Sequence, residues 1–209
     1  MKIEKYISLF ALVGFFALQA CKEVGPTVDF GKGKKEGLLL DTTYTETPVA
    51  ADLKNIVIEE FTGVQCLNCP TGHAILEDLK TQNPGRVIGV SLHSTFQDDA
   101  YASTKQVLTS EEAQQIENYL VFPGYKPNGG VNRKYSDAAT PTSLCVDYFN
   151  WQGYVNTELT ATAPVNIILQ KTYNASSREL TLDLELHYTQ NLSEKNKLSI
   201  FLLEDSIVT

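Results

Sequence analysis

The chain has 209 residues, of which 43% are hydrophobic and 20% are charged, and its formal net charge at pH 7 is −8. This composition is ordinary for a globular protein, and the length allows one full domain and part of another. An acidic chain without a basic stripe does not attract a phosphate backbone, so nucleic acid is not expected as a partner.

The N-terminus carries the signals of export. Residues 6–18 are apolar and follow a short basic start, and such a stretch is too short to span a bilayer but suits the core of a signal peptide. Ala20 and Cys21 come next, and this stretch resembles a bacterial lipobox. The resemblance implies cleavage before Cys21 and attachment of lipid to that residue, which anchors a protein stably in a membrane. We therefore expect residues 1–20 to be a lipoprotein signal peptide, with an ordinary secretory signal as the alternative.

The residues after Cys21 favour an outer-membrane destination and a flexible tether. Lys22 stands where enteric bacteria place an aspartate to retain a lipoprotein in the inner membrane, so the outer membrane is expected. The sequence leaves the membrane leaflet open. Glycines, a proline and a basic run at residues 32–35 make residues 21–48 a flexible tether.

The folded part is organised around a strand, a glycine turn and a Cys-x-x-Cys pair. Residues 56–61 are apolar and rich in β-branched side chains, which is typical of a buried parallel strand, and Gly63 allows a sharp turn. Cys66 then falls at the predicted start of a helix, where free amides and the helix dipole favour a thiolate. Cys69 lies one turn deeper, close enough for a disulfide with Cys66, and Pro70 suits the first helical turn. We expect Cys66 to be at least partly exposed and Cys69 to be buried beneath it.

The predicted helix continues into a second strand. The helix should end near residue 82, with Leu76 and Leu79 in the core and His73 on another, solvated face. A second buried strand is predicted at residues 87–92. A strand, a helix and a strand in close succession form a unit in which the two strands are parallel.

This segment resembles the active site of the thioredoxin superfamily, in which two cysteines three apart follow a strand and open a helix. Glu60 stands six residues before Cys66 and precedes a phenylalanine, as in the acid–phenylalanine pair of thioredoxins and protein disulfide isomerases. Gln65 replaces the usual tryptophan, and the dipeptide between the cysteines is Leu-Asn. The resemblance implies that Cys66 attacks a disulfide, Cys69 resolves the product and Glu60 moves the proton of Cys69.

Two other interpretations of the cysteine pair stay open. The pair can form a permanent structural disulfide in an inactive scaffold. It can also be half of a zinc site, which normally needs four ligands, and the candidates are Cys66, Cys69, His73 and Cys145. Nothing in the spacing brings Cys145 near the pair, and the sequence has no second Cys-x-x-Cys. We therefore expect neither a metal nor a cofactor.

A helical insertion is predicted after the second strand. Residues 93–125 are too long for a connection without structure of its own. Thr109 and Glu112 have the spacing of a capping box, and Ala113 begins an apolar face on the helix that follows. In a thioredoxin-like core such an insertion would border the active-site groove.

Pro127 is the candidate for a site residue after the insertion. Thioredoxin-like folds place a cis-proline just before their next strand, opposite the cysteine pair, and Pro127 fits that place with residues 130–134 as the strand. Pro123 is the weaker candidate for the cis bond. The alternative is a plain turn built on Asn128 and Gly129.

The predicted domain ends with a helix. Apolar side chains recur at helical spacing over residues 142–160, and Trp151 and Val155 belong to this core face. Cys145 lies beside the same face, and a lone cysteine in a helix is more often a small core residue than a reactive one. Pro164 should close the domain.

From Val165 the hydrophobic period changes to two. Strands are predicted at residues 165–169, 180–187 and 198–203, as a half-buried antiparallel meander in which His187 faces solvent. Three strands with one apolar face need a partner. We expect either a fragment of a longer chain or a sheet that packs on the preceding domain or on another subunit.

Taken together, these features resemble a group of Gram-negative outer-membrane lipoproteins, the 28-kilodalton outer-membrane protein family. The resemblance implies an α/β thioredoxin-like domain with a helical insertion at residues 49–163. It further implies an incomplete antiparallel, sandwich-like β region at residues 164–209, in a chain that continues beyond that point.

Two functions are expected from these features. The first is a membrane-tethered thiol–disulfide oxidoreductase that uses Cys66 and Cys69, with Glu60 as proton shuttle and Pro127 shaping a peptide groove. Its partners would be the outer membrane, through lipid on Cys21, and the thiols or disulfides of exported proteins. The second is a binding lipoprotein whose disulfide only braces its surface. The sequence identifies neither a redox partner nor the direction of exchange.

Overall fold

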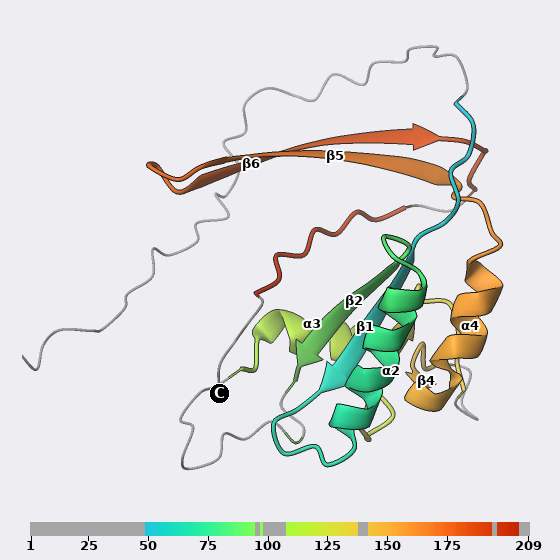
Figure 1. The fold of residues 1–209 in the computed structure, drawn as a ribbon, viewed down its shortest axis with the longest axis vertical. Coiled ribbons are helices and arrows are strands. Elements are labelled where there is room, and N and C mark those ends of the chain that lie inside the picture. Colours follow the sequence, from blue (N-terminus) through green and yellow to red (C-terminus); the bar gives the residue numbers. More distant parts are fainter. Residues whose placement is uncertain (1–48, 95–96, 98–107, 138–141, 194–195, 205–209) are drawn as a thin grey trace, which may run out of the picture. The chain divides into compact units, whose positions relative to one another are not determined.

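The structure of the chain is a computed structural model that describes residues 49–94, 97, 108–137, 142–193 and 196–204. The fold is mixed α/β, with a four-stranded mixed sheet and a separate two-stranded antiparallel sheet (Figure 1). Residues 1–20 and Cys21 lie outside the described ranges, so the expectations for them stay predictions. Within the described ranges, no helix has both the length and the apolar character needed to cross a membrane.

The four-stranded sheet is built around β1 (Ile56–Thr62), which lies between two neighbours in the order β2-β1-β3-β4. Strand β2 (Val87–His93) is parallel to β1, and β3 (Asn128–Val131) is antiparallel to it. The short β4 (Val146–Asp147) pairs with β3. Helix α2 (Cys69–Gln82) connects β1 to β2. The predicted strand–helix–strand unit with parallel strands is therefore confirmed.

Helix α3 (Glu111–Leu120) forms where the sequence predicts a helix, but its cap is displaced by one residue. Ser110, and not Thr109, is the N-cap residue, and its Oγ accepts a hydrogen bond from the amide of Ala113 at 3.0 Å. Ala113 and Leu120 are buried, as the predicted apolar face requires. Most of the segment between β2 and α3 lies outside the described residues.

The predicted helix over residues 142–160 is wrong in its first half. Its early residues form β4 and a 3₁₀ turn at Tyr148–Asn150, and helix α4 covers only Trp151–Glu158. The apolar periodicity is real, but pairing of β4 with β3 takes the first residues into the sheet. The side chain of Asp147 then accepts a hydrogen bond from the amide of Phe149, which caps the 3₁₀ turn.

Strand β1 has a hydrophobic core on each of its faces, because alternate side chains of a strand face opposite sides of the sheet. Ile58 belongs to the core that includes side chains of α2 and α4. Phe61 belongs to the core that includes side chains of α3. By the same alternation, Glu60 lies on the α2 face of β1 and Glu59 lies on the α3 face. Two buried carboxylates thus occupy adjacent positions on opposite faces of one strand.

The two-stranded sheet is a hairpin of β5 (Val165–Asn174) and β6 (Glu179–Tyr188), and Figure 1 shows it as a long ribbon. Oδ1 of Asn174 accepts a hydrogen bond from the amide of Ser176 at 3.0 Å and so stabilises the turn. Residues 198–203, predicted as a third strand, form none. Several large side chains on one face of the hairpin are exposed, namely Ile167, Leu169, Tyr173, Leu186 and Tyr188.

The opposite, polar face of the hairpin is covered at one end. His187 lies on this face, and its side chain is only 22% exposed, so it is partly buried and not fully in solvent as predicted. Asn166, its partner in the register, is buried. The side chain of Asn166 accepts a hydrogen bond from the amide of Asp52 and donates one to the carbonyl of Ala50. The segment that precedes β1 therefore packs against this end of the hairpin.

Candidate functional site

Cys66 and Cys69 form a disulfide, with their Cα atoms 5.4 Å apart. Helix α2 begins at Cys69, so the prediction that Cys66 opens the helix is wrong by three residues. The reason is a pair of turns, in which the amide of Cys66 donates to the carbonyl of Gly63 and the amide of Cys69 donates to the carbonyl of Cys66. Pro70 lies in the first turn of α2, as predicted.

The exposure of the cysteine pair also differs from expectation. Cys66 is only 6% exposed, so the predicted exposure of the first cysteine is wrong, whereas Cys69 is 3% exposed and buried as predicted. Leu67, between them, is 91% exposed. The turn that carries the pair therefore presents an apolar side chain to solvent and keeps both cysteine residues covered in the disulfide form.

Glu60 is fully buried on the α2 face of β1, beneath the helix that begins with Cys69. Its Oε2 accepts a hydrogen bond from Oγ of Ser91 at 3.1 Å and lies 2.8 Å from Nδ1 of His73. The structure thus places Glu60 next to α2. It also gives Glu60 a partner in His73, which the sequence predicts on a solvated face of the helix. His73 follows Cys69 by four residues, and this helical spacing was the signal that could have found it.

Pro127 packs against the same part of α2. The Lys126–Pro127 peptide bond is cis, as predicted, and β3 begins at the next residue. A Cβ atom placed on Gly72 would lie 2.8 Å from Cγ and 2.9 Å from Cβ of Pro127, and 3.2 Å from Oε1 of Glu60. Glu60 and Pro127 therefore both lie beside Gly72, which is one helical turn from Cys69.

The strand after Pro127 begins and ends earlier than predicted. Strand β3 covers Asn128–Val131, so the strand predicted at residues 130–134 is present but displaced toward Pro127, and the alternative of a plain turn at residues 128–129 is wrong. Asn132 and Arg133 both have φ of 50°, which ends the strand. A Cβ on Gly129 would lie 2.1 Å from the carbonyl oxygen of Glu59, so only glycine permits this approach of β3 to β1.

Lys126 is a buried cation next to Pro127 that the sequence does not reveal. Its Nζ donates to the carbonyl oxygen of Thr62 at 2.6 Å and to that of Ser94 at 3.2 Å. Thr62 ends β1 and Ser94 follows β2, so the ammonium group ties the carboxyl ends of two parallel strands to the Pro127 loop. This contact positions the loop relative to the turn that leads to Cys66.

Cys145 is a free thiol away from this site. It is buried with Phe61 and Leu120 in the core on the α3 face, and burial raises the pKa of its thiol to about 11. The prediction of a small core cysteine is confirmed, although the residue lies before β4 and not in a helix. The four candidate zinc ligands are not assembled, because Cys69 and His73 lie on α2, across the sheet. The described ranges hold no group of three or more histidine, cysteine, aspartate or glutamate residues placed to bind a metal.

Glu59, on the α3 face, forms an ion pair with Arg133. The guanidinium contacts both carboxylate oxygens, at 2.5 Å and 2.7 Å, and it also lies over the ring of Tyr119. A carboxylate held by two parallel hydrogen bonds is a rigid structural contact. We therefore assign Glu59 to the support of the sheet and Glu60 to the candidate site.

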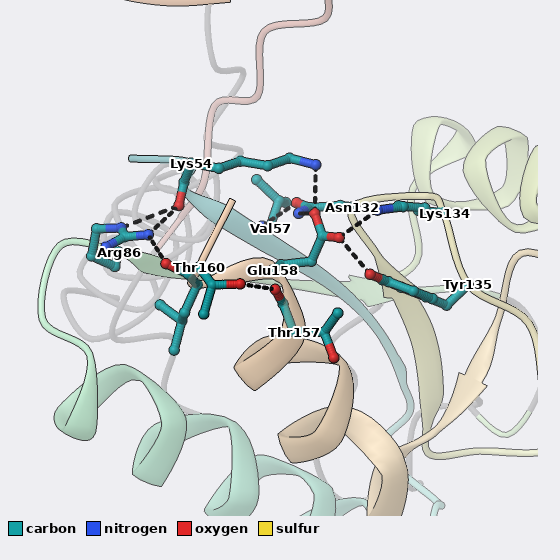
Figure 2. Close-up of polar contacts among 10 residues, drawn as sticks. Lys54, Val57, Arg86, Asn132, Lys134, Tyr135, Thr157, Glu158 and Thr160 are labelled. Carbon is teal, nitrogen blue, oxygen red and sulfur yellow. Dashed lines mark hydrogen bonds and ion pairs between the residues drawn. The ribbon is translucent and has the colours of Figure 1, made fainter. Parts of the chain in front are cut away.

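Glu158, at the end of α4, is another buried carboxylate, and it accepts hydrogen bonds from four side chains (Figure 2). These are Lys54 at 2.5 Å, Lys134 at 2.7 Å, Asn132 at 3.0 Å and the hydroxyl of Tyr135. Burial alone would raise the pKa of Glu158, but the hydrogen bonds from these donors outweigh it and hold the pKa well below its ordinary value. The cluster fastens the turn after β3 and the residues before β1 to α4.

Comparisons with known proteins leave the family open. No family model matches the chain, and no curated protein matches it. Among solved structures, the crystal structure of protein AGR_C_4864 from Agrobacterium tumefaciens is similar, with 19% sequence identity and a TM-score of 0.43. The match covers 65% of this chain and 58% of that protein, so the chain spans less than two thirds of its length.

Replacing Gly72 by alanine tests the contact between α2 and Pro127. The added Cβ would overlap the proline ring, and overpacking of this kind costs about 1–3 kcal/mol. Alanine also gains about 1 kcal/mol of helix propensity. We expect a net loss of about 1 kcal/mol in the free energy of unfolding, measured by urea denaturation.

The matched control is Gly153→Ala in α4, where a Cβ meets nothing within 4 Å. This variant should gain about 0.5–1 kcal/mol from helix propensity alone. Equal stabilisation of both variants would show that α2 and the Pro127 loop are not in contact.

Proposed function

We propose that the protein is a thioredoxin-like thiol–disulfide oxidoreductase. The observation that carries the proposal is the gathering of Glu60 and Pro127 around the first turns of the helix that Cys69 begins. A reversible dithiol needs a nucleophilic sulfur, a resolving sulfur and a group that accepts the proton of the second thiol. The cysteine pair and the buried carboxylate supply these three functions.

The proposed reaction is an exchange between this dithiol and a protein disulfide. The Cys66 thiolate attacks a substrate sulfur, forming a mixed disulfide and releasing the other substrate sulfur as a thiolate. Cys69 loses its proton to Glu60 and attacks the sulfur of Cys66, which releases the second substrate thiolate. The substrate gains two electrons, and the protein is left with the Cys66–Cys69 disulfide. The same steps in reverse oxidise a substrate dithiol.

We further propose that the protein acts in the cell envelope as a lipoprotein of the outer membrane. The support is the sequence ending in Cys21 and the glycine-containing tether at residues 21–48. On this proposal the likeness to the 28-kilodalton outer-membrane protein family extends to function, with exported proteins as substrates. Labelling with a radioactive fatty acid should mark the wild-type protein and leave Cys21→Ser unmarked.

A second candidate function is a binding lipoprotein in which the disulfide is a static brace. The observation that favours it is the burial of both cysteine residues, because an attacking thiolate or its target sulfur must be reached by substrate. On this alternative, the exposed Leu67 belongs to the binding surface and the dithiol does not turn over.

Turnover of insulin disulfides separates the two candidates. With dithiothreitol as the reductant, the wild-type protein should accelerate insulin reduction, and Cys66→Ser should fall to the rate of dithiothreitol alone. Cys145→Ser is the control, because that thiol is buried on the other side of the sheet. A wild-type rate equal to that of Cys66→Ser would favour the static brace.

A further inference from the structure

The inference concerns His73 and its contact with the buried acid of the candidate site. Nδ1 of His73 lies 2.8 Å from Oε2 of Glu60, and the imidazole side chain is 48% exposed while Glu60 is fully buried. One end of this pair therefore reaches solvent and the other is enclosed by protein. Such an arrangement is suited to moving a proton between water and a buried carboxylate.

The other oxygen of Glu60 supports a role beyond structure. Oε1 is buried and has no hydrogen-bond partner among the described residues. It lies in the contact between α2 and Pro127, 3.2 Å from the position of a Cβ on Gly72. A buried carboxylate oxygen without a donor costs free energy, and protonation of that oxygen would relieve part of the cost.

The groups around His73 leave Glu60 as its main electrostatic partner. On α2, Glu77 and Lys80 pair with each other at 2.6 Å and act on the imidazole with opposite signs. The hydrogen bond that His73 donates to Glu60 raises the pKa of His73 above its ordinary value of 6.5, and partial burial opposes this shift. The imidazole therefore keeps its second proton to a higher pH than an unperturbed histidine does.

The polar and charged groups on β2 and in the loop before β3 contact other partners or lie further from His73 along the sheet. On β2, Ser91 donates to Glu60, and His93 lies two residues beyond it on the same face of the strand. In the loop before β3, the ammonium group of Lys126 is bound by the carbonyl oxygens of Thr62 and Ser94.

Resting on the proposed oxidoreductase function, we propose that His73 is a proton-relay residue that connects Glu60 to solvent. As the sulfur of Cys69 attacks the mixed disulfide, its proton passes to Glu60, and the bond between Cys66 and the substrate breaks. Glu60 then passes this proton to Nδ1 of a neutral His73 that carries its ring hydrogen on Nε2, and the resulting imidazolium releases the Nε2 hydrogen to water. Glu60 is then ionised and His73 is neutral with its hydrogen on Nδ1, and exchange of protons between the exposed imidazole and water restores the Nε2–H form before the next cycle.

The test uses dithiobis(nitrobenzoate), a coloured disulfide probe, with reduced protein in a Cys145→Ser background. Attack by Cys66 releases a first equivalent of coloured thiolate, and resolution by Cys69 releases a second. His73→Gln keeps an amide that can bond to Glu60 but cannot relay protons. We expect the first release to be unchanged and the second to slow by about tenfold or more, with loss of the inflection in its pH profile that comes from titration of His73.

His187→Gln is the matched control, because His187 also contacts a carboxylate, that of Glu185 at 3.3 Å, but lies on the hairpin. It should leave both releases unchanged. A second release from His73→Gln with the wild-type rate and pH profile would overturn the relay and leave the oxidoreductase intact. A wild-type protein that gives no second release would overturn both.

A separate measurement checks the contact itself without depending on turnover. In an NMR titration, Glu60→Gln should lower the pKa of His73 toward 6.5 relative to the wild type. If the wild-type imidazole already titrates at its ordinary value, the two side chains are not coupled and the relay is wrong.

Discussion

Replacing Glu158 by glutamine is expected to lower the free energy of unfolding by about 3 kcal/mol, the lower end of the range for breaking a buried ion pair. Glutamine keeps the volume of the side chain but removes the charge that holds Lys54 and Lys134. Its amide nitrogen would also face hydrogen-bond donors, since all the groups that contact Glu158 donate to it. The loss stays at the lower end because both lysines are partly exposed and can be hydrated.

Urea denaturation measures this loss, and Glu77→Gln is its control. Glu77 also pairs with a lysine, Lys80, at 2.6 Å, but both side chains are well exposed. Exposed pairs of this kind contribute about 0.3–0.5 kcal/mol. A loss of similar size in both variants would mean that the donors around Glu158 do not form the buried cluster of Figure 2.

The effect of Glu158→Gln on the free energy of unfolding should also depend on pH. Because the pKa of Glu158 in the folded protein is lowered from 4.5, the unfolded chain takes up the proton first as the pH falls. The stabilisation by Glu158 is therefore complete above about pH 5 and is lost as the pH falls below 4.5 toward the pKa of the folded protein. The stability difference between the wild type and Glu158→Gln should shrink over that range.

The first part of the fold could be predicted because its signals are local. Residues 56–61 and 87–92 are short apolar runs, and Pro70 and the residues near 83 mark the ends of a helix. Each of these features acts through its own backbone or its nearest neighbours. The strand, helix and strand therefore appear where the sequence places them, and only the start of α2 moves, because two turns after Gly63 delay it.

The remaining elements depend on contacts between distant residues. The apolar residues at 142–150 have helical spacing, but β4 is drawn into the sheet by β3. Strand β3 is short because Asn132 and Arg133 turn away with positive φ, and Asn132 bonds to Val57 and Glu158. No local sequence pattern indicates these partners. Helical periodicity and β propensity therefore predict the wrong boundaries for β3 and α4.

Some residues of the candidate site could be predicted from the sequence, and others are placed by contacts between distant residues. The resemblance around the cysteine pair predicts Glu60, and it also predicts a proline opposite the pair. The imidazole of His73 and the ammonium group of Lys126 are placed by tertiary contacts with Glu60 and with strand ends. Spacing along α2 offers a hint for His73, and nothing in the sequence distinguishes Lys126 from a surface lysine.

The second large expected effect concerns Cys69. Replacing Cys69 by serine removes the sulfur that resolves the mixed disulfide, so the covalent complex between Cys66 and a substrate should accumulate. In the wild-type protein, the Cα atoms of Cys66 and Cys69 are 5.4 Å apart. Resolution is therefore intramolecular, and the complex is short-lived. Turnover of insulin by Cys69→Ser should fall by orders of magnitude, while the first attack by Cys66 persists.

Trapping of that complex is the most direct measurement of the proposed exchange. Cys69→Ser would be incubated with oxidised insulin, quenched with acid and separated on a non-reducing gel, beside Cys66→Ser and the wild type. We predict a dithiothreitol-sensitive adduct with Cys69→Ser and none with Cys66→Ser. The absence of an adduct from folded Cys69→Ser would contradict the oxidoreductase proposal and leave the Cys66–Cys69 disulfide as a structural brace.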